Sequence, residues 1–206
     1  MDVQSLVGVP KRYSSRRPGR SMKGARDESG SELIRNYRQE DRGFLEGGLD
    51  EILAEKASSA SSKEIRPARG WGRSYARSLL SYVRRTKGIA LVAEVGAIRA
   101  GFAVGVLDRG IPTWMLRSGA FSRRGSVLEI HVDPRFRSSG LGGRLMSELE
   151  RRLARRGCDW ITAAYHEGHE FEARLYRSCG YVVNSVGVAK WLPKRGSGRA
   201  PRNDPQ

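Results

Sequence analysis

Residues 132–145 read VDPRFRSSGLGGRL, a glycine- and arginine-rich turn between two apolar segments. The apolar run 126–132 before the turn predicts a strand, and leucines at every fourth position of 140–156 predict a helix with one apolar face. The turn therefore places the first, unpaired amides of a helix beside three glycines and three arginines. These residues are Gly140, Gly142, Gly143, Arg135, Arg137 and Arg144. The pattern is typical of a site for a phosphate-bearing ligand.

Neither of the two best-known phosphate loops fits this turn. A P-loop continues with Lys and then Ser or Thr, whereas Gly143 is followed by Arg144 and Leu145. The dinucleotide-binding fingerprint needs Gly or Ala at its third small position, which Leu145 occupies here. A glycine-rich helix start without any ligand is the remaining alternative. We favour a ligand because the glycines and the positive charge coincide at one helix start.

The rest of the chain alternates between extended and helical patterns. Two apolar runs on either side of Gly96 and Ala97 predict an antiparallel hairpin. Asp41 is expected to cap the first helix, and Gly157 to end the helix 140–156. Strands are expected at 33–37, 89–95, 98–107, 126–132, 160–165 and 181–191, and helices at 44–53, 71–83, 140–156 and 170–178. The sequence thus predicts one α/β domain over residues 31–192.

The net charge of +16 is spread over the chain. Residues 1–30 hold seven Lys or Arg against three Asp or Glu, and residues 193–206 hold four against one, which leaves +9 for 31–192. Both ends lack apolar periodicity and are predicted to be disordered basic tails. Such a charge attracts nucleic acid or a ligand with several phosphates. Because no apolar run approaches the roughly 20 residues of a membrane span and two cysteines make no disulfide framework, we expect a cytoplasmic protein that does not bind membranes.

Two separated motifs resemble those of one family. Residues 137–142, RSSGLG, resemble the Arg/Gln-x-x-Gly-x-Gly/Ala signature of the GNAT family of N-acetyltransferases, and the preceding Val132-Asp133-Pro134 is similar to the end of that family's fourth strand. Residues 173–181, ARLYRSCGY, resemble the family's Leu-Tyr-x-x-x-Gly-Phe/Tyr segment. The resemblance covers about residues 32–192. It implies a mostly antiparallel mixed sheet in which the strands at 126–132 and 160–165 splay apart.

The resemblance also implies acetyl-CoA as the donor and no metal. In the family, amides of the turn hold the pyrophosphate, and a bulge, expected here near Val132, presents main-chain groups to the pantetheine arm between the splayed strands. His169 stands where many members have an asparagine that contacts the cofactor, and it could replace that donor. The residues that the resemblance assigns to the cofactor are Ile130, Val132, Arg137, Ser138, Ser139, Gly140, Leu141, Gly142, Gly143, Arg144 and His169.

The resemblance gives Tyr176 the role of the general acid that protonates the leaving thiolate. Its phenol, with an ordinary pKa near ~10, holds its proton at neutral pH. Glu129, in the strand that lines the gap, is the candidate base, although it could instead bind a cationic substrate. His131, His166 and His169 are alternatives, as is water. Residues 166–170, HEGHE, do not match the zinc motif H-E-x-x-H, because the two histidines are three positions apart.

The leading hypothesis is direct acetyl transfer from acetyl-CoA to a primary amine of an unidentified acceptor, a small molecule or a protein. Acidic residues at 46, 50, 51 and 55 could attract a cationic acceptor, but a solvated acidic helix face explains them better. A nucleic-acid- or ribosome-associated binding protein is the alternative from another class, and a non-catalytic CoA-binding domain is the third. The basic tails would bind polyanions weakly, and a homodimer is compatible with the sequence.

Overall fold

The computed structural model describes residues 31–58, 68–107, 123–166 and 169–184. The expected tails 1–30 and 193–206 and most of the connection 108–125 lie outside these residues. The elements in chain order are β1 (Glu32–Asn36), η2 (Gln39–Asp41), α1 (Arg42–Ser58), α2 (Trp71–Arg85), β2 (Ile89–Val95), β3 (Ile98–Leu107), β4 (Arg124–Val132), η4 (Pro134–Phe136), α3 (Leu141–Arg155), β5 (Trp160–Thr162) and α4 (Glu170–Ser178). None of the described helices is long and apolar enough to cross a membrane.

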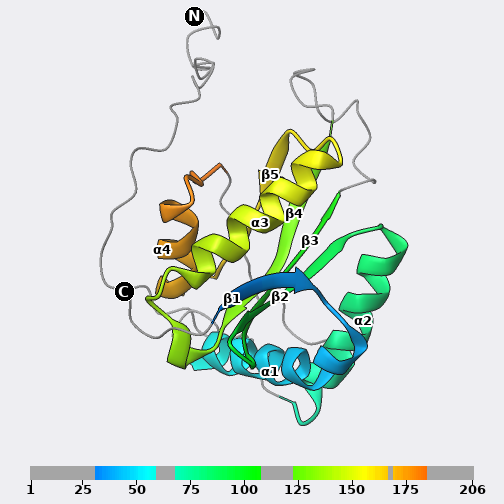
Figure 1. Cartoon of the computed structure of the whole chain (residues 1–206), viewed down its shortest axis with the longest axis vertical. Coiled ribbons are helices and arrows are strands. Elements are labelled where there is room, and N and C mark those ends of the chain that lie inside the picture. Colours follow the sequence, from blue (N-terminus) through cyan, green and yellow to red (C-terminus); the bar gives the residue numbers. More distant parts are fainter. Residues whose placement is uncertain (1–30, 59–67, 108–122, 167–168, 185–206) are drawn as a thin grey trace, which may run out of the picture.

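The strands of the described residues form one five-stranded sheet in the order β1-β2-β3-β4-β5. Neighbours are antiparallel except β4 and β5, which are parallel. The turn at Gly96, where φ is +61°, joins β2 to β3 as the expected hairpin. Figure 1 shows α1 and α2 on one side of this sheet and α3 and α4 on the other. The predicted fold class, a mixed and mostly antiparallel sheet with flanking helices, is confirmed.

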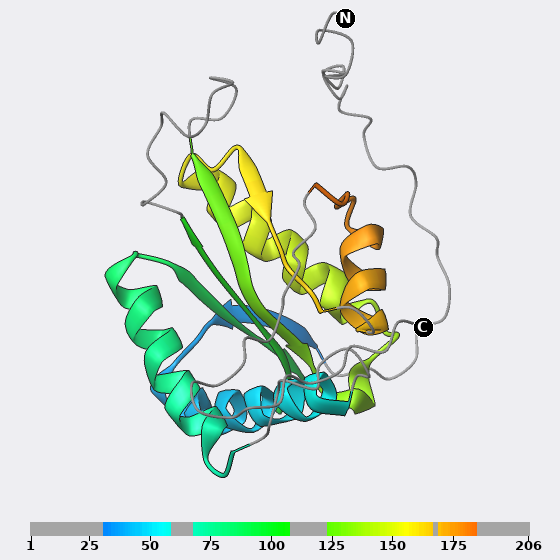
Figure 2. The ribbon, with the colours of Figure 1, turned by 180° about the vertical axis from the view of Figure 1, so that it is seen from behind.

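Strands β4 and β5 separate soon after they meet. They pair only where Arg124–Ser126 faces Trp160–Thr162, and the chain leaves the sheet after Thr162, earlier than the expected end at 165. Figure 2 shows β5 beside one part of β4 only. The bulge expected near Val132 lies elsewhere: Val104 faces Glu129 and Gly105 faces Val127, so Leu128 is the extra residue. Because β5 ends early, a gap is left in the sheet beside the second half of β4.

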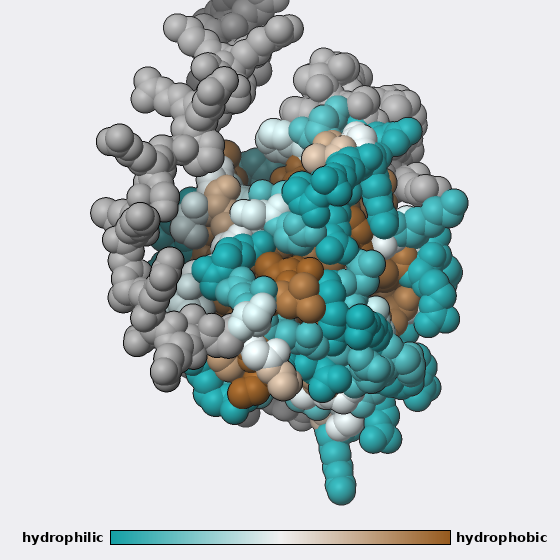
Figure 3. Space-filling view, in the orientation of Figure 1, coloured by the Kyte–Doolittle hydropathy of each residue, from teal (hydrophilic) through white to brown (hydrophobic). Residues whose placement is uncertain are grey.

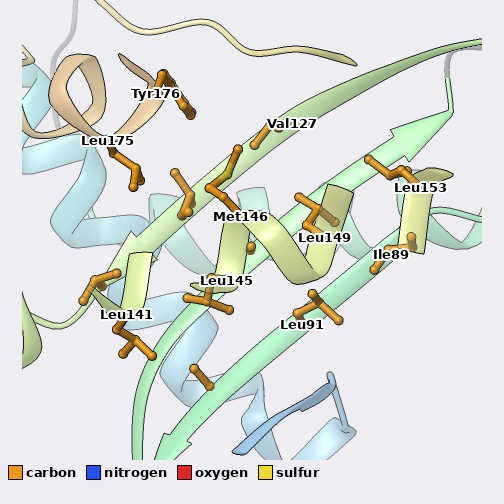
Figure 4. Packing of buried hydrophobic residues seen from close by; sticks show 14 of the residues in the cluster. Ile89, Leu91, Val127, Leu141, Leu145, Met146, Leu149, Leu153, Leu175 and Tyr176 are labelled. Atoms are coloured by element: carbon orange, nitrogen blue, oxygen red, sulfur yellow. The ribbon is translucent and has the colours of Figure 1, made fainter. Parts of the chain in front are cut away.

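Two apolar clusters hold the helices to the sheet. The leucines of α3 pack with Leu91 of β2, Val127 of β4 and Tyr176 of α4 in the larger cluster, as Figure 4 shows. The smaller cluster joins Leu49 of α1 and Leu79 of α2 to Phe102 of β3. Each buried leucine of this kind contributes about 2 kcal/mol to folding. The leucines of α3 therefore fix the position of this helix on the sheet, and its first turn carries the glycine-rich motif.

Asp41 does not have the expected role at the start of the first helix. Its side chain is fully buried and accepts hydrogen bonds from Arg35, Arg99 and the main-chain N–H of Arg38. These donors hold the pKa of the Asp41 carboxyl well below its usual range, although burial opposes them. The hydrogen bond to Arg38 belongs to η2, which precedes α1. The buried Asp41 carboxylate thus fastens β1 to β3 through ion pairs with Arg35 and Arg99.

The last predicted strand, 181–191, is not seen in the part that is described. Residues 181–184 belong to no strand, and 185–191 lie outside the described residues. Val182 and Val183 are 80% and 73% exposed. The face of the molecule in Figure 3 is mostly hydrophilic, with small apolar patches between polar side chains.

Candidate active site

The glycine-rich turn forms one wall of a cavity of about 380 Å³. Two residues of the turn, Ser138 and Gly140, have φ values of +66° and +80°, so the chain bends sharply before α3 begins. The cavity is lined by Val132, Phe136, Arg137, Ser138, Gly140, Gly142, Gly143, Phe171, Arg174 and Leu175. Six of the eleven residues expected to bind the cofactor are therefore brought together. Sequence reasoning missed the two phenylalanines, Arg174 and Leu175.

Local hydrogen bonds explain why the turn adopts this shape. The carboxylate of Asp133 accepts from the N–H of Arg135 and opens η4 at Pro134. The Ser139 hydroxyl donates to the carbonyl of Phe136 at 2.8 Å. The first amides of α3 have no partner within the helix, and the helix dipole adds partial positive charge there. Because Gly142 and Gly143 lack side chains, an anion can approach these amides closely.

The three arginines of the motif have different environments. Arg137 donates to the carbonyl of Val132 at 3.1 Å, pairs with Glu55 of α1 at 2.5 Å, and lies over the Phe171 ring. Arg144 pairs with Glu32 of β1 at 2.6 Å and is not part of the cavity lining. Arg135 pairs with its neighbour Asp133. Of these three side chains, only that of Arg137 lines the cavity.

The remaining residues expected at the cofactor are placed less directly. The side chains of Ile130 and Leu141 are 2% and 1% exposed in the apolar core, so only their main-chain groups could reach a ligand. Ser139 bonds within the turn. His169 precedes α4, and its Nδ1 lies 3.6 Å from Oε2 of Glu172. The four remain predictions as cofactor contacts, as does Arg144.

Glu129 lies on β4 beside the gap and is 7% exposed. Its Oε1 accepts the Tyr75 hydroxyl of α2 at 2.7 Å, and Lys56 Nζ of α1 lies 3.8 Å from Oε2. Burial raises the pKa of the Glu129 carboxyl, while Lys56 and Tyr75 oppose that shift. The sequence did not indicate that Lys56 and Tyr75 would lie beside Glu129. Glu129 is therefore a buried carboxylate with a hydrogen bond on Oε1 and a cation near Oε2.

Tyr176 projects from α4 toward the same region and is 5% exposed. Its ring centre lies 6.2 Å from that of Tyr165 and 5.6 Å from that of Tyr181. Burial raises the pKa of the phenol, and the charges of Glu172 and Glu129 raise it further. The hydroxyl consequently holds its proton throughout the neutral range. This is the state that a proton donor requires.

The three histidines do not form one group. His131 is 3% exposed, stacks on Phe102 of β3, and lies 3.4 Å from Glu51 of α1. Burial lowers its pKa to about 4, so it is neutral at pH 7. His166 is exposed, with its ring centre 6.3 Å from that of His169. Burial lowers the pKa of His169 as well. Within the described ranges, no cluster of three or more His, Cys, Asp or Glu could hold a metal ion.

The sequence predicted a solvated acidic face for α1. The structure differs, because each of the four acids has a partner. Asp50 accepts the main-chain N–H of Gly72 at 2.7 Å, and Glu46 pairs with Arg42. Glu51 lies near His131, and Glu55 pairs with Arg137. These contacts fasten α1 to α2, to β4 and to the glycine-rich turn. The end of α1 is thereby held against the gap.

A buried carboxylate that sequence reasoning missed completes the site. Glu172 of α4 is 7% exposed, and the charges of Lys56, Glu129 and Glu55 act on its carboxyl. Burial raises its pKa to about 7, with Glu129 and Glu55 adding to the shift and Lys56 opposing it. Its position four residues before Tyr176, on the same helix face, was the available indication. Lys56 and Tyr75 gave no such indication, since their roles depend on how α1 and α2 pack on β4.

Comparison with known proteins identifies the class of this domain. The fold places a glycine-rich helix start, a gap beside β4 and a buried tyrosine around one region. The model of the Acetyltransferase (GNAT) family matches residues 53–181. The chain belongs to the GNAT family of acetyltransferases.

Solved structures share this fold at low sequence identity. A predicted acetyltransferase with acetyl-CoA from Clostridium acetobutylicum has a TM-score of 0.58 and 15% identity, covering 79% of this chain and 95% of that one. The ribosomal-protein-alanine N-acetyltransferase of Brucella melitensis has a TM-score of 0.56 and 20% identity, with 79% and 100% covered. An aminoglycoside N-acetyltransferase in complex with CoA has a TM-score of 0.55 and 13% identity, with 82% and 99% covered.

Proposed function

We propose that this protein transfers the acetyl group of acetyl-CoA directly to a primary amine. The observation that carries the proposal is the arrangement around α3 and α4. The cavity at the first turn of α3 is lined by Leu175, whose neighbour Tyr176 is buried beside the carboxylates of Glu129 and Glu172. A phosphate-binding helix start thus adjoins a place where protons can be exchanged.

The residues of the turn fit the pyrophosphate of CoA. A Cβ on Gly143 would meet no atom within 4 Å, so the space beside its Cα is open, and Arg137 supplies a positive charge at the cavity wall. The amides of Gly142 and Gly143 would hold the phosphates, and the open edge of β4 would contact the pantetheine arm. Bound acetyl-CoA would supply an activated acetyl thioester.

The chain's own groups provide the proton transfers. Tyr176 donates its phenolic proton to the sulfur as the thiol leaves, and its raised pKa ensures that the phenol still holds that proton at neutral pH. Glu129 places a negative charge at the acceptor end, where it attracts an ammonium group or takes up its proton. Tyr75 and Lys56 keep this carboxylate in position.

The acceptor is an amine of a small molecule or of a protein or peptide. The fold does not choose between them, since similar structures carry names as different as aminoglycoside and ribosomal-protein-alanine acetyltransferase. The natural test is free-thiol release from acetyl-CoA with a panel of aminoglycosides, polyamines, amino acids, peptides with free N-termini and aminoacyl-tRNA. We expect thiol release with at least one of these amines. A wild-type protein that binds no acetyl-CoA would refute the proposal.

Gly143→Asp offers a sharper test of the cofactor site. The new carboxylate stands in the first turn of α3, where a negative charge stabilises a helix, so folding is retained. The same charge would oppose the phosphates and weaken acetyl-CoA binding by about 10- to 100-fold. Gly143→Asn, of equal size and without charge, is the matched control and should bind several-fold more tightly than Gly143→Asp. Equal affinities of the two variants by calorimetry would place the phosphates elsewhere.

The proposed enzyme comprises residues 31–192 and acts in the cytoplasm, with 1–30 and 193–206 as basic tails that bind polyanions weakly. A variant that lacks both tails should keep its thiol-releasing activity and lose retention on heparin. Loss of activity with retained heparin binding would contradict this division. A homodimer would appear in sedimentation equilibrium as a doubled mass.

A further inference from the structure

Glu172 is buried without a hydrogen-bond partner for one of its oxygens. Its side chain is 9% exposed, and Oε2 has no partner among the described residues. Nδ1 of His169 lies 3.6 Å from this oxygen, beyond hydrogen-bond distance. Nε2 of His169 is equally buried and likewise has no partner within the described ranges. Such groups cost stability, and their retention points to a polar ligand.

The gap between β4 and β5 explains which groups surround Glu172. Because β5 leaves β4 after Thr162, no strand of the described residues lies beside the second half of β4, between α4 and the end of α1. The groups that act on the Glu172 carboxyl or adjoin it are Glu55 and Lys56 of α1, Tyr75 of α2 through Glu129, Glu129 of β4, His166 and His169 before α4, and Tyr176 of α4. The carboxyl has an ordinary pKa in the unfolded chain, and burial raises that pKa to about 7 in the fold.

Glu172 and Tyr176 are four residues apart on α4 and lie one helical turn from each other on the same face. The two carboxylates of the region differ in one respect. Glu129 accepts a hydrogen bond from the Tyr75 hydroxyl, whereas Oε2 of Glu172 has no hydrogen-bond partner among the described residues. A carboxylate that is free to form a new hydrogen bond is the better proton acceptor.

We propose that Glu172 is the residue that takes the proton from the acceptor ammonium, while Glu129 holds the cation in place. This inference rests on the proposed acetyl transfer and assigns its base. A single helix, α4, then carries both the acceptor of the first proton and, one turn later, the donor of the last.

The protons and bonds balance in this scheme. The ammonium N–H bond breaks, its electron pair stays on nitrogen, and the proton binds Glu172 and later leaves to water. The nitrogen lone pair forms the C–N bond to the acetyl carbon as the C–S bond breaks, and the sulfur takes the proton of Tyr176. The second amine proton returns to the Tyr176 oxygen. The products are an amide, a free thiol and one released proton.

Glu172→Gln is the variant that tests the inference, and Glu170→Gln on the same helix is its control, because Glu170 is exposed. Thiol release is measured against pH with the amine of the panel that gives the highest wild-type rate. We expect Glu172→Gln to lower kcat by about 100-fold. The rise of the wild-type rate near pH 7 should disappear, while KM for acetyl-CoA stays within about twofold. Glu170→Gln should keep the wild-type rate and pH profile.

Two results would overturn the inference while leaving the proposed function intact. One is an active wild-type enzyme whose rate and pH profile survive Glu172→Gln. The other is a raised KM for acetyl-CoA with an unchanged pH profile, which would make Glu172 a contact of the cofactor. A wild type that releases no thiol with any amine would instead refute the proposed function and the inference together. Carboxyl NMR of protein labelled at glutamate adds an independent measurement: a Glu172 signal that titrates at the ordinary glutamate value contradicts the assignment.

Discussion

Two buried acids in this protein have opposite surroundings. Asp41 is fully buried with Arg35, Arg99 and the amide of Arg38 as donors, and these donors hold its pKa well below the usual range. Glu172 is 7% exposed and has an oxygen without a hydrogen-bond partner among the described residues, and burial raises its pKa to about 7. Burial alone therefore does not decide the charge of a carboxyl. The donors around it do.

The difference separates a structural role from a chemical one. A buried charge with all its partners connects strands and has no capacity left for a substrate. A buried carboxyl with a free oxygen destabilises the fold whenever it ionises, and a protein keeps such a group where its titration is used. The comparison between the Asp41 cluster and Glu172 can be tested by removing each charge in turn.

The largest effect is expected at Asp41. Asp41→Asn removes the charge that pairs two arginines, and we expect a loss of about 3–5 kcal/mol in the free energy of unfolding at pH 7. Because the folded pKa of Asp41 is lowered, its contribution is present above the unfolded value and lost as pH falls. The deficit of the variant should therefore shrink in acid, as urea unfolding at several pH values would show. Glu40→Gln, at an exposed neighbour, should stay within about 0.5 kcal/mol of wild type.

Removing the charge of Glu172 should act in the opposite direction. Its folded pKa is raised, so the stability contribution of the carboxyl is intact below the unfolded value and is lost as pH rises through about 7. Glu172→Gln should consequently be more stable than wild type at pH 8, by up to about 3 kcal/mol, with little difference near pH 4. Thermal unfolding at the two pH values measures this. A variant that is less stable at pH 8 would mean that Glu172 has a partner.

The smallest effect is expected from removing the hydrogen-bond donor of Glu129. Tyr75→Phe keeps the ring that stacks on Trp71 and removes the hydroxyl on the carboxylate. We expect the pKa of Glu129 to rise further and kcat/KM at neutral pH to fall by about tenfold, since a hydrogen bond to a charged group is worth about 1.5 kcal/mol. Part of this loss should be recovered at higher pH. Tyr82→Phe, at an exposed position of the same helix, should have no effect.

Local pattern predicted the framework of the site correctly. The leucine repeat placed α3, Gly96 placed the hairpin, and Gly157, with φ of +83°, ends the helix as expected. These features depend on neighbours in sequence. The residues of the turn that line the cavity lie next to the start of α3 in the sequence, so their position follows from the predicted helix.

What the sequence did not reveal depends on contacts between distant segments. The ion-pair partner of Arg144, Glu32, lies 112 residues away in the sequence. Asp41 was expected as a cap, and arginines from two strands surround it. Glu172 becomes significant only because β5 leaves the sheet early and exposes α4 to the end of α1. Contacts between such distant segments leave no periodic pattern in the sequence, so they could not be predicted from it.

The central claim is tested most directly by thiol release from acetyl-CoA with the wild-type protein and with Tyr176→Phe, across the amine panel. Acetyl transfer predicts one thiol per acetylated amine for the wild type, and a loss of about 100-fold or more when the phenol is removed. Two results would contradict the account. One is a wild-type protein that binds acetyl-CoA and releases no thiol with any amine, and the other is an equal rate for the wild type and Tyr176→Phe.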